Sequence, residues 1–360
     1  MINILIPLAG KNTFKTDIHN PFPKILSDVD GQLVIERAAK SLIDLNHKKI
    51  VVAVPKEEAD KYKLKNVISL LSDTIEVCSI NGDTQGAACS ALLAIEHLEL
   101  ESPLVISSLE QILDFDLNPY IEDFEKNNVD AGVLTFEAIH PKWSFVRVND
   151  KQIVTQAAEK DPISKNAIAG LYYFKTAKDF IEAAKSIIRK DVKTNGLFFI
   201  SQALNEIILK EGVVKALPID KNRYFHINDE SSLTNFEESI KDKNQSQKER
   251  VKLATKKYIQ YFNAKEITAL GSMLSDDFTL EEPNEKIVGK GKSLIHIDKI
   301  FSENPSLSFN ALNIFVPDKK TSIIEFELNL NDVNLKGIDI IKWSDQDEIK
   351  ELKAYINEKK

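Results

Sequence analysis

The hydrophobic pattern of the first two thirds of the chain alternates short apolar runs with amphipathic segments. Residues 2–8 form an apolar run that is typical of a strand buried on both faces of a sheet. A helical pattern covers 34–45. The alternation continues with predicted strands at 49–54, 74–79, 103–107 and 131–138, and predicted helices at 64–71, 87–98 and 118–127. This order predicts an α/β fold with a mostly parallel, Rossmann-like sheet and right-handed crossovers.

The fold prediction also indicates where chemistry should lie. Ligands of such sheets bind beyond the carboxyl ends of the strands, so the loops after residues 8, 79 and 107 are the first places to look. Farther along, short strands dominate 144–174, and helices are predicted near 178–189 and 198–210. We place the first domain at residues 1–240.

A change of pattern marks a second domain. Residues 241–252 begin with KDKNQSQKERV, which has no apolar residue before its final valine and predicts a linker or a solvated helix. In residues 253–360, helices are predicted at 253–262 and 267–274, followed by strands at 278–282, 307–316, 321–330, 335–343 and 348–355. Helices before a curved antiparallel sheet predict a smaller α+β domain.

Composition narrows the functional classes. The chain has 360 residues, of which 43% are hydrophobic and 28% charged, an ordinary globular balance. It has no run of about 18 apolar residues, and its start shows no signal-peptide pattern. Cys78 and Cys89 stand among apolar or small residues, so we expect core thiols in a cytoplasmic protein. A net charge of −8 argues against a nucleic-acid partner but permits a mononucleotide.

The loop after the first strand, LAGKNTFKTDIHNPFPK at 8–24, starts as a small-residue turn and ends at Pro23-Lys24. Backbone N–H groups of such a turn can cradle phosphates, and a lysine can supply positive charge. Taken alone, the segment fits an ordinary loop better.

Its neighbours change that interpretation. The loop is followed by DVDGQLVIE at 28–36, and then in order by Gln85-Gly86-Ala87-Ala88, SSLEQ at 107–111, Glu159-Lys160 and Ala169-Gly170-Leu171-Tyr172. Together these segments resemble the signature of sugar-phosphate nucleotidyltransferases, whose first part reads L-A-G-G-x-G-T-R-L and then P-K. The resemblance covers about residues 1–240. It implies transfer of a nucleoside monophosphate from a triphosphate to a phosphorylated small molecule, with release of pyrophosphate.

The resemblance also assigns roles to particular residues. Transfers of this kind depend on positioning and charge neutralisation rather than on a protein nucleophile. Lys24 would neutralise the triphosphate and Lys160 the attacking phosphate. The nucleotide would be seated by Leu8, Ala9, Gly10, Gln85 and Gly86, and the sugar phosphate by Glu159, Lys160 and Gly170.

Three positions depart from the family pattern. Phe14 stands in place of the loop arginine, and Lys11 or Lys15 would substitute for that cation. The two metal-binding aspartates align with Glu110 and His226. Glutamate and histidine can ligate a divalent cation, although Mg²⁺ prefers oxygen ligands. We expect a working variant that binds Mg²⁺ or another divalent cation. The alternative is a decayed site in a catalytically silent paralogue that binds nucleotides or sugar phosphates.

Residues 255–360 resemble the SnoaL-like families, relatives of nuclear transport factor 2. The resemblance lies in Tyr261-Phe262 and in the segments 273–278, 289–291, 337–341 and 350–356. It implies a helix-backed cone with an apolar pocket, and often a dimer. Asp339 would be a pocket acid with Glu281 or His296 beside it, although strand alternation lets Asp339 face either side. We expect this domain to form a homodimer rather than to perform chemistry; an isomerase or cyclase is the alternative.

The combined expectation is a cytoplasmic nucleotidyltransferase that supplies an activated precursor for a cell-surface polysaccharide. It acts without nucleic acid or membrane partners. The sequence does not identify the base or the acceptor.

Overall fold

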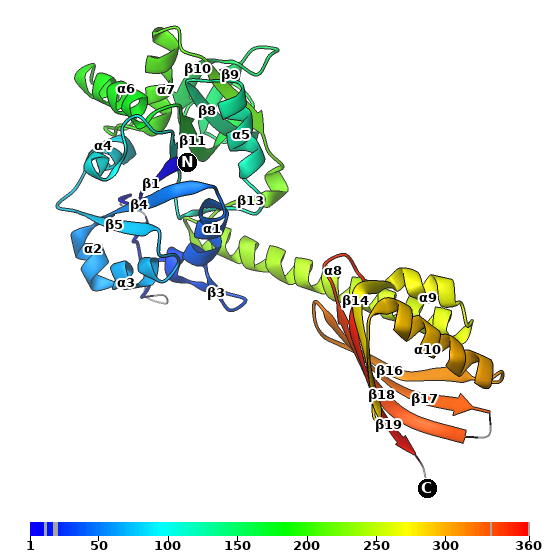
Figure 1. Ribbon diagram of the computed structural model, residues 1–360. Helices are drawn as coiled ribbons and strands as arrows, with labels where there is room; N and C mark the ends of the chain where they lie inside the picture. Colours follow the sequence, from blue (N-terminus) through cyan, green and yellow to red (C-terminus); the bar gives the residue numbers. More distant parts are fainter. Residues whose placement is uncertain (11–12, 17–20, 332, 359–360) are drawn as a thin grey trace. The chain divides into compact units, whose positions relative to one another are not determined.

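The computed structural model describes residues 1–10, 13–16, 21–331 and 333–358. The chain divides into two compact units, Met1–Glu237 and Glu238–Lys360 (Figure 1). Helix α8 (Glu230–Asn263) runs through the boundary, and residues 241–252 lie within it. In the part of the chain that the structure describes, no helix combines the length and apolar character needed to span a bilayer.

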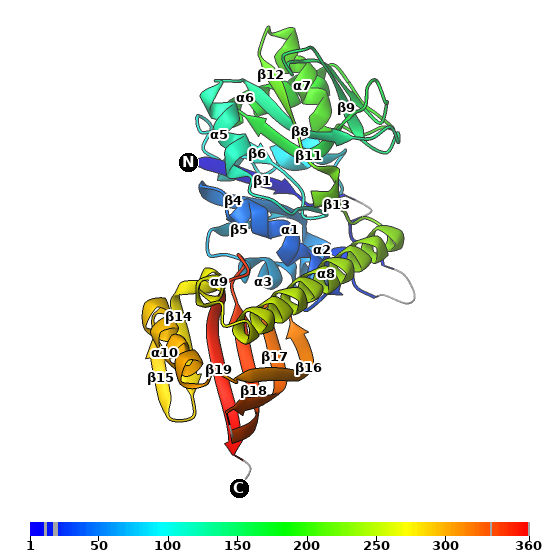
Figure 2. The same cartoon turned by 90° about the vertical axis from the view of Figure 1, so that its right-hand side faces the viewer.

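The first unit is built on a parallel core of four strands in the order β5-β4-β1-β6 (Figure 2). These are β1 (Ile2–Pro7), β4 (His47–Pro55), β5 (Ile75–Ile80) and β6 (Leu104–Ile106). Strand β1 is central and is buried on both faces, as its apolar run predicts. The predicted α/β fold with a mostly parallel central sheet is confirmed.

The remaining strands extend the sheet beyond β6. Strand β11 (Asn166–Phe174) runs antiparallel to β6, to β8 (Ala131–Glu137) and to β9 (Ser144–Val148). Strand β10 (Val154–Glu159) pairs with β9, and β12 (Val214–Pro218) runs parallel to β8. The short strands β2 (Asp28–Val29) and β3 (Gln32–Leu33) form a separate hairpin.

Helices follow the predicted crossovers and pack on both faces of this sheet. They are α1 (Val34–Ile43), α2 (Lys56–Lys61), α3 (Leu64–Ser69), α4 (Ala87–Leu92), α5 (Asn118–Lys126), α6 (Ala177–Arg189) and α7 (Ile200–Leu209). Leu5 shares a buried cluster with Ala91 of α4, Phe180 of α6 and Leu204 of α7. On another sheet surface, Phe124 of α5 stacks on Tyr173 with 5.4 Å between ring centroids.

A two-stranded ribbon brings a late segment back to the loop after β6. Strand β7 (Gln111–Leu113) pairs antiparallel with β13 (Tyr224–His226), so that Gln111 lies opposite His226. Residues separated by more than a hundred positions in the sequence therefore meet at the carboxyl end of β6.

The second unit is a six-stranded curved sheet in the order β15-β14-β19-β18-β17-β16, with helices beside it (Figure 1). Its elements are α9 (Ile267–Met273), β14 (Leu274–Glu282), β15 (Glu285–Val288), α10 (Lys290–Glu303), β16 (Ser308–Asp318), β17 (Thr321–Leu330), β18 (Val333–Trp343) and β19 (Ile349–Glu358). The α+β prediction is confirmed. The predicted antiparallel pairing is wrong at one place, because β14 and β19 run parallel. Helix α10 connects β15 at one edge of the sheet to β16 at the other edge. The antiparallel meander β16–β19 then returns across the sheet, and its last strand, β19, lies parallel to β14.

Candidate functional site

A pocket of about 440 Å³ lies at the carboxyl ends of β1 and β6 in the first unit. Its walls come from the turn after β1, the start of α4, the loop after β6 and strands β10, β11 and β13. Of the residues that the sequence assigns to nucleotide, sugar phosphate and metal, this pocket brings together Ala9, Gly10, Gly86, Glu110, Glu159, Lys160, Gly170 and His226.

Other predicted residues do not line the pocket. Leu8 is buried in the core, and Lys15 and Gln85 are exposed. Gln85 contributes its backbone carbonyl, which accepts a hydrogen bond from the N–H of Phe198 at 2.8 Å. Lys11 lies outside the described residues.

Lys24 is not among the described lining residues, and it forms an ion pair. It begins a short 3-10 helix (Lys24–Leu26), and its side chain is only 11% exposed. Its Nζ contacts the carboxylate of Glu230, the first residue of α8. A triphosphate that reached Lys24 would therefore compete with this carboxylate for its charge.

Two glycines allow close backbone approach around the pocket. Gly86 has a φ of +109°, and a Cβ there would lie 2.4 Å from the carbonyl oxygen of Phe198. Gly170 has a φ of +64°, and a Cβ there would lie 1.9 Å from Oε1 of Gln111. The positive φ favours glycine at both positions, and an added Cβ would meet backbone at Gly86 and the Gln111 side chain at Gly170.

Gln111 is a site residue for which the sequence motifs predicted no role. Its Nε2 donates hydrogen bonds to the carbonyl of Gly170 at 2.8 Å and to Oγ of Ser107 at 3.0 Å. The pairing of β11 with β8 shifts between Ile168 and Tyr172, next to this contact. Gln111 therefore fixes the irregular part of β11 that forms one wall of the pocket.

Glu159 is oriented by two hydroxyl groups from distant segments. Ser201 donates to its Oε2 at 2.7 Å, and Ser144 donates to the same oxygen. Burial raises the pKa of Glu159, while the two hydroxyls and the charge of Lys160 oppose that rise. The ammonium of Lys160 lies 5.0 Å from the ring centroid of Phe199, so this cation also has a defined place in the pocket.

The ribbon β7–β13 brings the two candidate metal ligands to one end of the pocket. The N–H of Ile227, next to His226, donates to the carbonyl of Glu110 at 2.7 Å. Burial raises the pKa of the Glu110 carboxyl to about 7, although a hydrogen bond from Thr13 lowers it. Burial, with a smaller contribution from the charge of Lys142, lowers the pKa of His226 to about 4. At neutral pH the imidazole is therefore uncharged and able to act as a ligand.

The side chains of Glu110 and His226 could supply part of the ligand set of a divalent cation. Within the described residues, Nδ1 of His226 is buried and has no hydrogen-bond partner, an arrangement that suits a metal ligand. The same residues contain no group of three or more His, Cys, Asp or Glu side chains placed to hold a metal. One carboxylate and one imidazole suit a cation that accepts nitrogen and takes its other ligands from substrate phosphate and water.

The second unit has a pocket of its own, of about 600 Å³, and Asp339 lines it. The sequence left open which face of its strand Asp339 occupies. In the structure Asp339 faces the pocket, and it is 4% exposed. Glu281 is not a lining residue and lies 3.4 Å from Nζ of Lys353. His296 is not a lining residue either. Its Nε2 lies 3.0 Å from Oε2 of Glu282, and Glu282 does line the pocket.

Comparisons with known proteins agree with the geometry of the first unit. No family model matches the chain. Over 221 residues the chain is 25% identical to the UTP–glucose-1-phosphate uridylyltransferase AglF of Haloferax volcanii, covering 59% of this chain and 86% of that protein. The first unit is therefore similar to sugar-phosphate nucleotidyltransferases.

Two further similarities involve the first unit. The chain is 26% identical over 255 residues to the bifunctional protein GlmU of Campylobacter fetus, covering 67% of this chain and 54% of that protein. The chain thus spans about half the length of that relative. A nucleoside-diphosphate-sugar pyrophosphorylase from Vibrio cholerae has the same fold, with a TM-score of 0.56, 19% identity, and coverage of 66% of this chain and 100% of its own.

Proposed function

We propose that the first unit transfers a nucleoside monophosphate from a triphosphate to a sugar 1-phosphate or a similar phosphorylated small molecule. The observation that carries this proposal is the single pocket that collects Gly10, Glu110, Glu159, Lys160 and His226 at the carboxyl ends of β1 and β6. The similarity to a UTP–glucose-1-phosphate uridylyltransferase supports the same reaction class.

The residues of the pocket suit an in-line phosphoryl transfer. An oxygen of the acceptor phosphate attacks the α-phosphorus, the bond from that phosphorus to the bridging oxygen breaks, and pyrophosphate leaves. Lys160 neutralises the acceptor phosphate, and Glu159 accepts hydrogen bonds from acceptor hydroxyls. Gly10 and Gly86 let the backbone approach the nucleotide.

Glu110 and His226 are the residues that would hold a divalent cation, Mg²⁺ or one more tolerant of nitrogen. Such a cation supplies charge neutralisation to the reacting phosphates. The chain's own contribution is to keep the imidazole neutral and the carboxylate within the same pocket. Thr13 contributes by donating to Glu110.

Pyrophosphate release from the full chain tests this proposal. Each nucleoside triphosphate is combined with a panel of sugar phosphates, with divalent cation or with chelator. We expect one pair to release pyrophosphate only with the cation. Lys160→Ala should lower turnover by about two orders of magnitude, the scale for loss of one charge-stabilising group. Lys165→Ala, an exposed lysine paired with Glu137, is the matched control and should leave turnover unchanged. No release from any pair would overturn the proposed activity.

A catalytically silent paralogue is the second candidate. It is favoured by the burial of Phe14 at the family's arginine position and by the pairing of Lys24 with Glu230. Equilibrium binding separates the two: a silent paralogue binds a triphosphate or sugar phosphate without releasing pyrophosphate. If neither ligand binds, both candidates are wrong.

We further propose that the second unit forms a homodimer through the outer face of its sheet. Leu312, Ile338 and Tyr355 are 44%, 44% and 57% exposed, and Ile338 and Tyr355 are direct cross-strand partners. Glu325 and Lys336 lie beside them, so the face offers charges of both signs to an identical copy. We also propose that the protein acts in the cytoplasm and that its product is a precursor of a cell-surface polysaccharide.

A further inference from the structure

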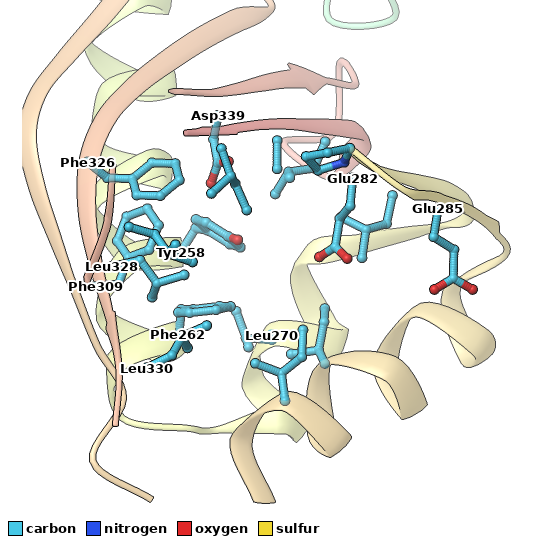
Figure 3. A pocket seen from close by; sticks show the side chains of 18 of the residues that line it. Tyr258, Phe262, Leu270, Glu282, Glu285, Phe309, Phe326, Leu328, Leu330 and Asp339 are labelled. Atoms are coloured by element: carbon cyan, nitrogen blue, oxygen red, sulfur yellow. The ribbon is translucent and has the colours of Figure 1, made fainter. Parts of the chain in front are cut away.

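The pocket of the second unit lies between the inner face of its sheet and helices α8, α9 and α10 (Figure 3). It measures about 600 Å³, within the range of small-molecule sites. Its wall is mostly apolar, with Phe262 from α8, Leu270 from α9, Ile297 from α10, and Phe309, Phe326 and Leu328 from the sheet. The size and lining suit a compact apolar molecule.

Asp339 is the polar group most deeply set in this wall. It lies in the middle of β18, opposite Ile324 and Ala354, and its side chain points into the pocket (Figure 3). It is 4% exposed, and in the described part of the chain its Oδ1 has no hydrogen-bond partner. Burying a carboxyl group without a partner is costly, so a ligand that supplies a donor would relieve an existing penalty.

The other charged groups on the pocket wall have the same sign as Asp339. Glu282 from β14 and Glu285 from β15 also line it, whereas Lys and Arg are missing from the described lining residues. His296 lies beside both glutamates, with its Nε2 3.0 Å from Glu282 and its Nδ1 3.9 Å from Glu285. Tyr258 from α8 is the remaining titratable group in the wall. Asp339 therefore has no cation facing it among these groups.

Burial, followed by the negative charge of Glu282, raises the pKa of Asp339 to about 8. Near neutral pH the carboxyl is mostly protonated. A cation that entered the pocket would favour its ionised form and would form a charge-assisted hydrogen bond with it.

We propose that this pocket binds a small apolar molecule that carries a basic amine. The ammonium group contacts Asp339, and the apolar body lies among Phe262, Phe309 and Phe326. An ammonium supplies the donor that Oδ1 lacks and the positive charge that the wall lacks. This site is independent of the nucleotidyl transfer proposed for the first unit.

Three matched probes test the proposal with the full chain: 2-(2-naphthyl)ethylamine, 2-(2-naphthyl)ethanol and 2-naphthylacetate. They share an apolar body and differ in the polar group. Titration followed by naphthalene fluorescence should show the amine binding at least about tenfold more tightly than the alcohol, a difference of one charge-assisted contact. The carboxylate should bind weakest, because its negative charge meets those of Glu282 and Glu285 on the pocket wall.

Two variants locate the binding. Asp339→Asn keeps the shape of the side chain and should reduce the amine's affinity to that of the alcohol. Glu281→Gln makes the same change outside the pocket lining and should leave the preference intact. Leu270→Trp fills the pocket and should weaken the amine and alcohol alike. Circular dichroism verifies that each variant is folded.

Several results would overturn the proposal. These are equal affinity for amine and alcohol in the unmodified chain, no binding of either probe, an unchanged amine preference in Asp339→Asn, or unchanged binding in Leu270→Trp. Because the assay uses neither nucleotides nor sugar phosphates, its outcome does not depend on activity of the first unit.

Discussion

Glu110 combines a carboxyl of raised pKa with a candidate metal-binding role, and the two make its cation affinity sensitive to pH. Its pKa of about 7 means that protons and a cation compete for the same oxygens near neutrality. We predict that Mn²⁺ affinity, measured by electron paramagnetic resonance without nucleotide, falls about tenfold per pH unit below 7 and is flat above. His226, with a pKa of about 4, stays neutral between pH 5 and 8 and adds no slope there.

Two substitutions separate this mechanism from general surface binding of Mn²⁺. Glu110→Gln should bind the cation weakly at every pH and lose the slope, whereas Glu110→Asp should keep it. The same pH slope in Glu110→Gln would exclude Glu110 from the metal site.

Gly170 tests the packing of the pocket wall independently of activity. An alanine there meets both a positive φ and Oε1 of Gln111, so we predict a loss of about 1–3 kcal/mol in unfolding free energy. Gly196→Ala is the control, because Gly196 has a φ of +76° but nothing within 4 Å of its added Cβ. Urea unfolding should show the larger loss for Gly170→Ala. Equal losses would mean that backbone strain alone, and not the contact with Gln111, explains the cost.

For single residues, the sequence indicated those that belong to short motifs better than those that hold the motif residues in place. Short motifs drew attention to Glu159, Lys160 and Gly170, which line the pocket. Gln111, by contrast, acts on Gly170 across 59 positions, and Ser201 on Glu159 across 42. A lone glutamine or serine carries no periodic or motif signal for such a contact. The pairing of Lys24 with Glu230 is equally invisible in the sequence.

Helices and strands with a clear hydrophobic periodicity were predicted, and those without such a periodicity were missed. The buried run of β1 and the amphipathic α6 are of the first kind. Helix α10 has a weaker pattern, with only Ser293, Ile297 and Phe301 buried, and the four-residue β15 is too short to show alternation. The parallel pairing of β14 with β19 depends on the route of α10, which local sequence does not encode.

Helix α8 permits a prediction about its exposed middle. Ser246 is exposed within it, and proline there would remove a backbone hydrogen bond and cost about 3 kcal/mol of helix stability. We predict that Ser246→Pro leaves both units folded but makes the chain a better substrate for trypsin at Lys243 or Lys248. Ser246→Ala should be cleaved as slowly as the unmodified chain.

Mass spectrometry of the fragments and circular dichroism before digestion check this prediction. Loss of folded structure in either unit of Ser246→Pro would contradict it, because each unit has its own buried core.

The whole molecule should owe its assembly to residues 255–360. We predict that a chain ending after Glu249 is a folded monomer that keeps much of its triphosphate affinity, and that the full chain is a dimer. Ile338→Lys combined with Tyr355→Lys should yield a monomer, because each ammonium would be buried in an interface between two copies. Leu93→Lys, at an exposed leucine of the first unit, is the control. Light scattering distinguishes these cases, and a dimeric truncated chain would contradict the prediction.

Asp339 has one more consequence, for the energetics of the folded second unit. Its pKa is about 8 in the folded chain and 3.8 ordinarily, so at neutral pH the folded state holds a proton that unfolding releases. Stability from this group is therefore complete below about pH 4 and declines as pH rises to about 8. Urea titrations from pH 5 to 9 should show this decline in the transition of residues 238–360, and Asp339→Asn should reduce it. An unmodified chain whose second transition does not weaken with rising pH would show that the carboxyl is already ionised when folded.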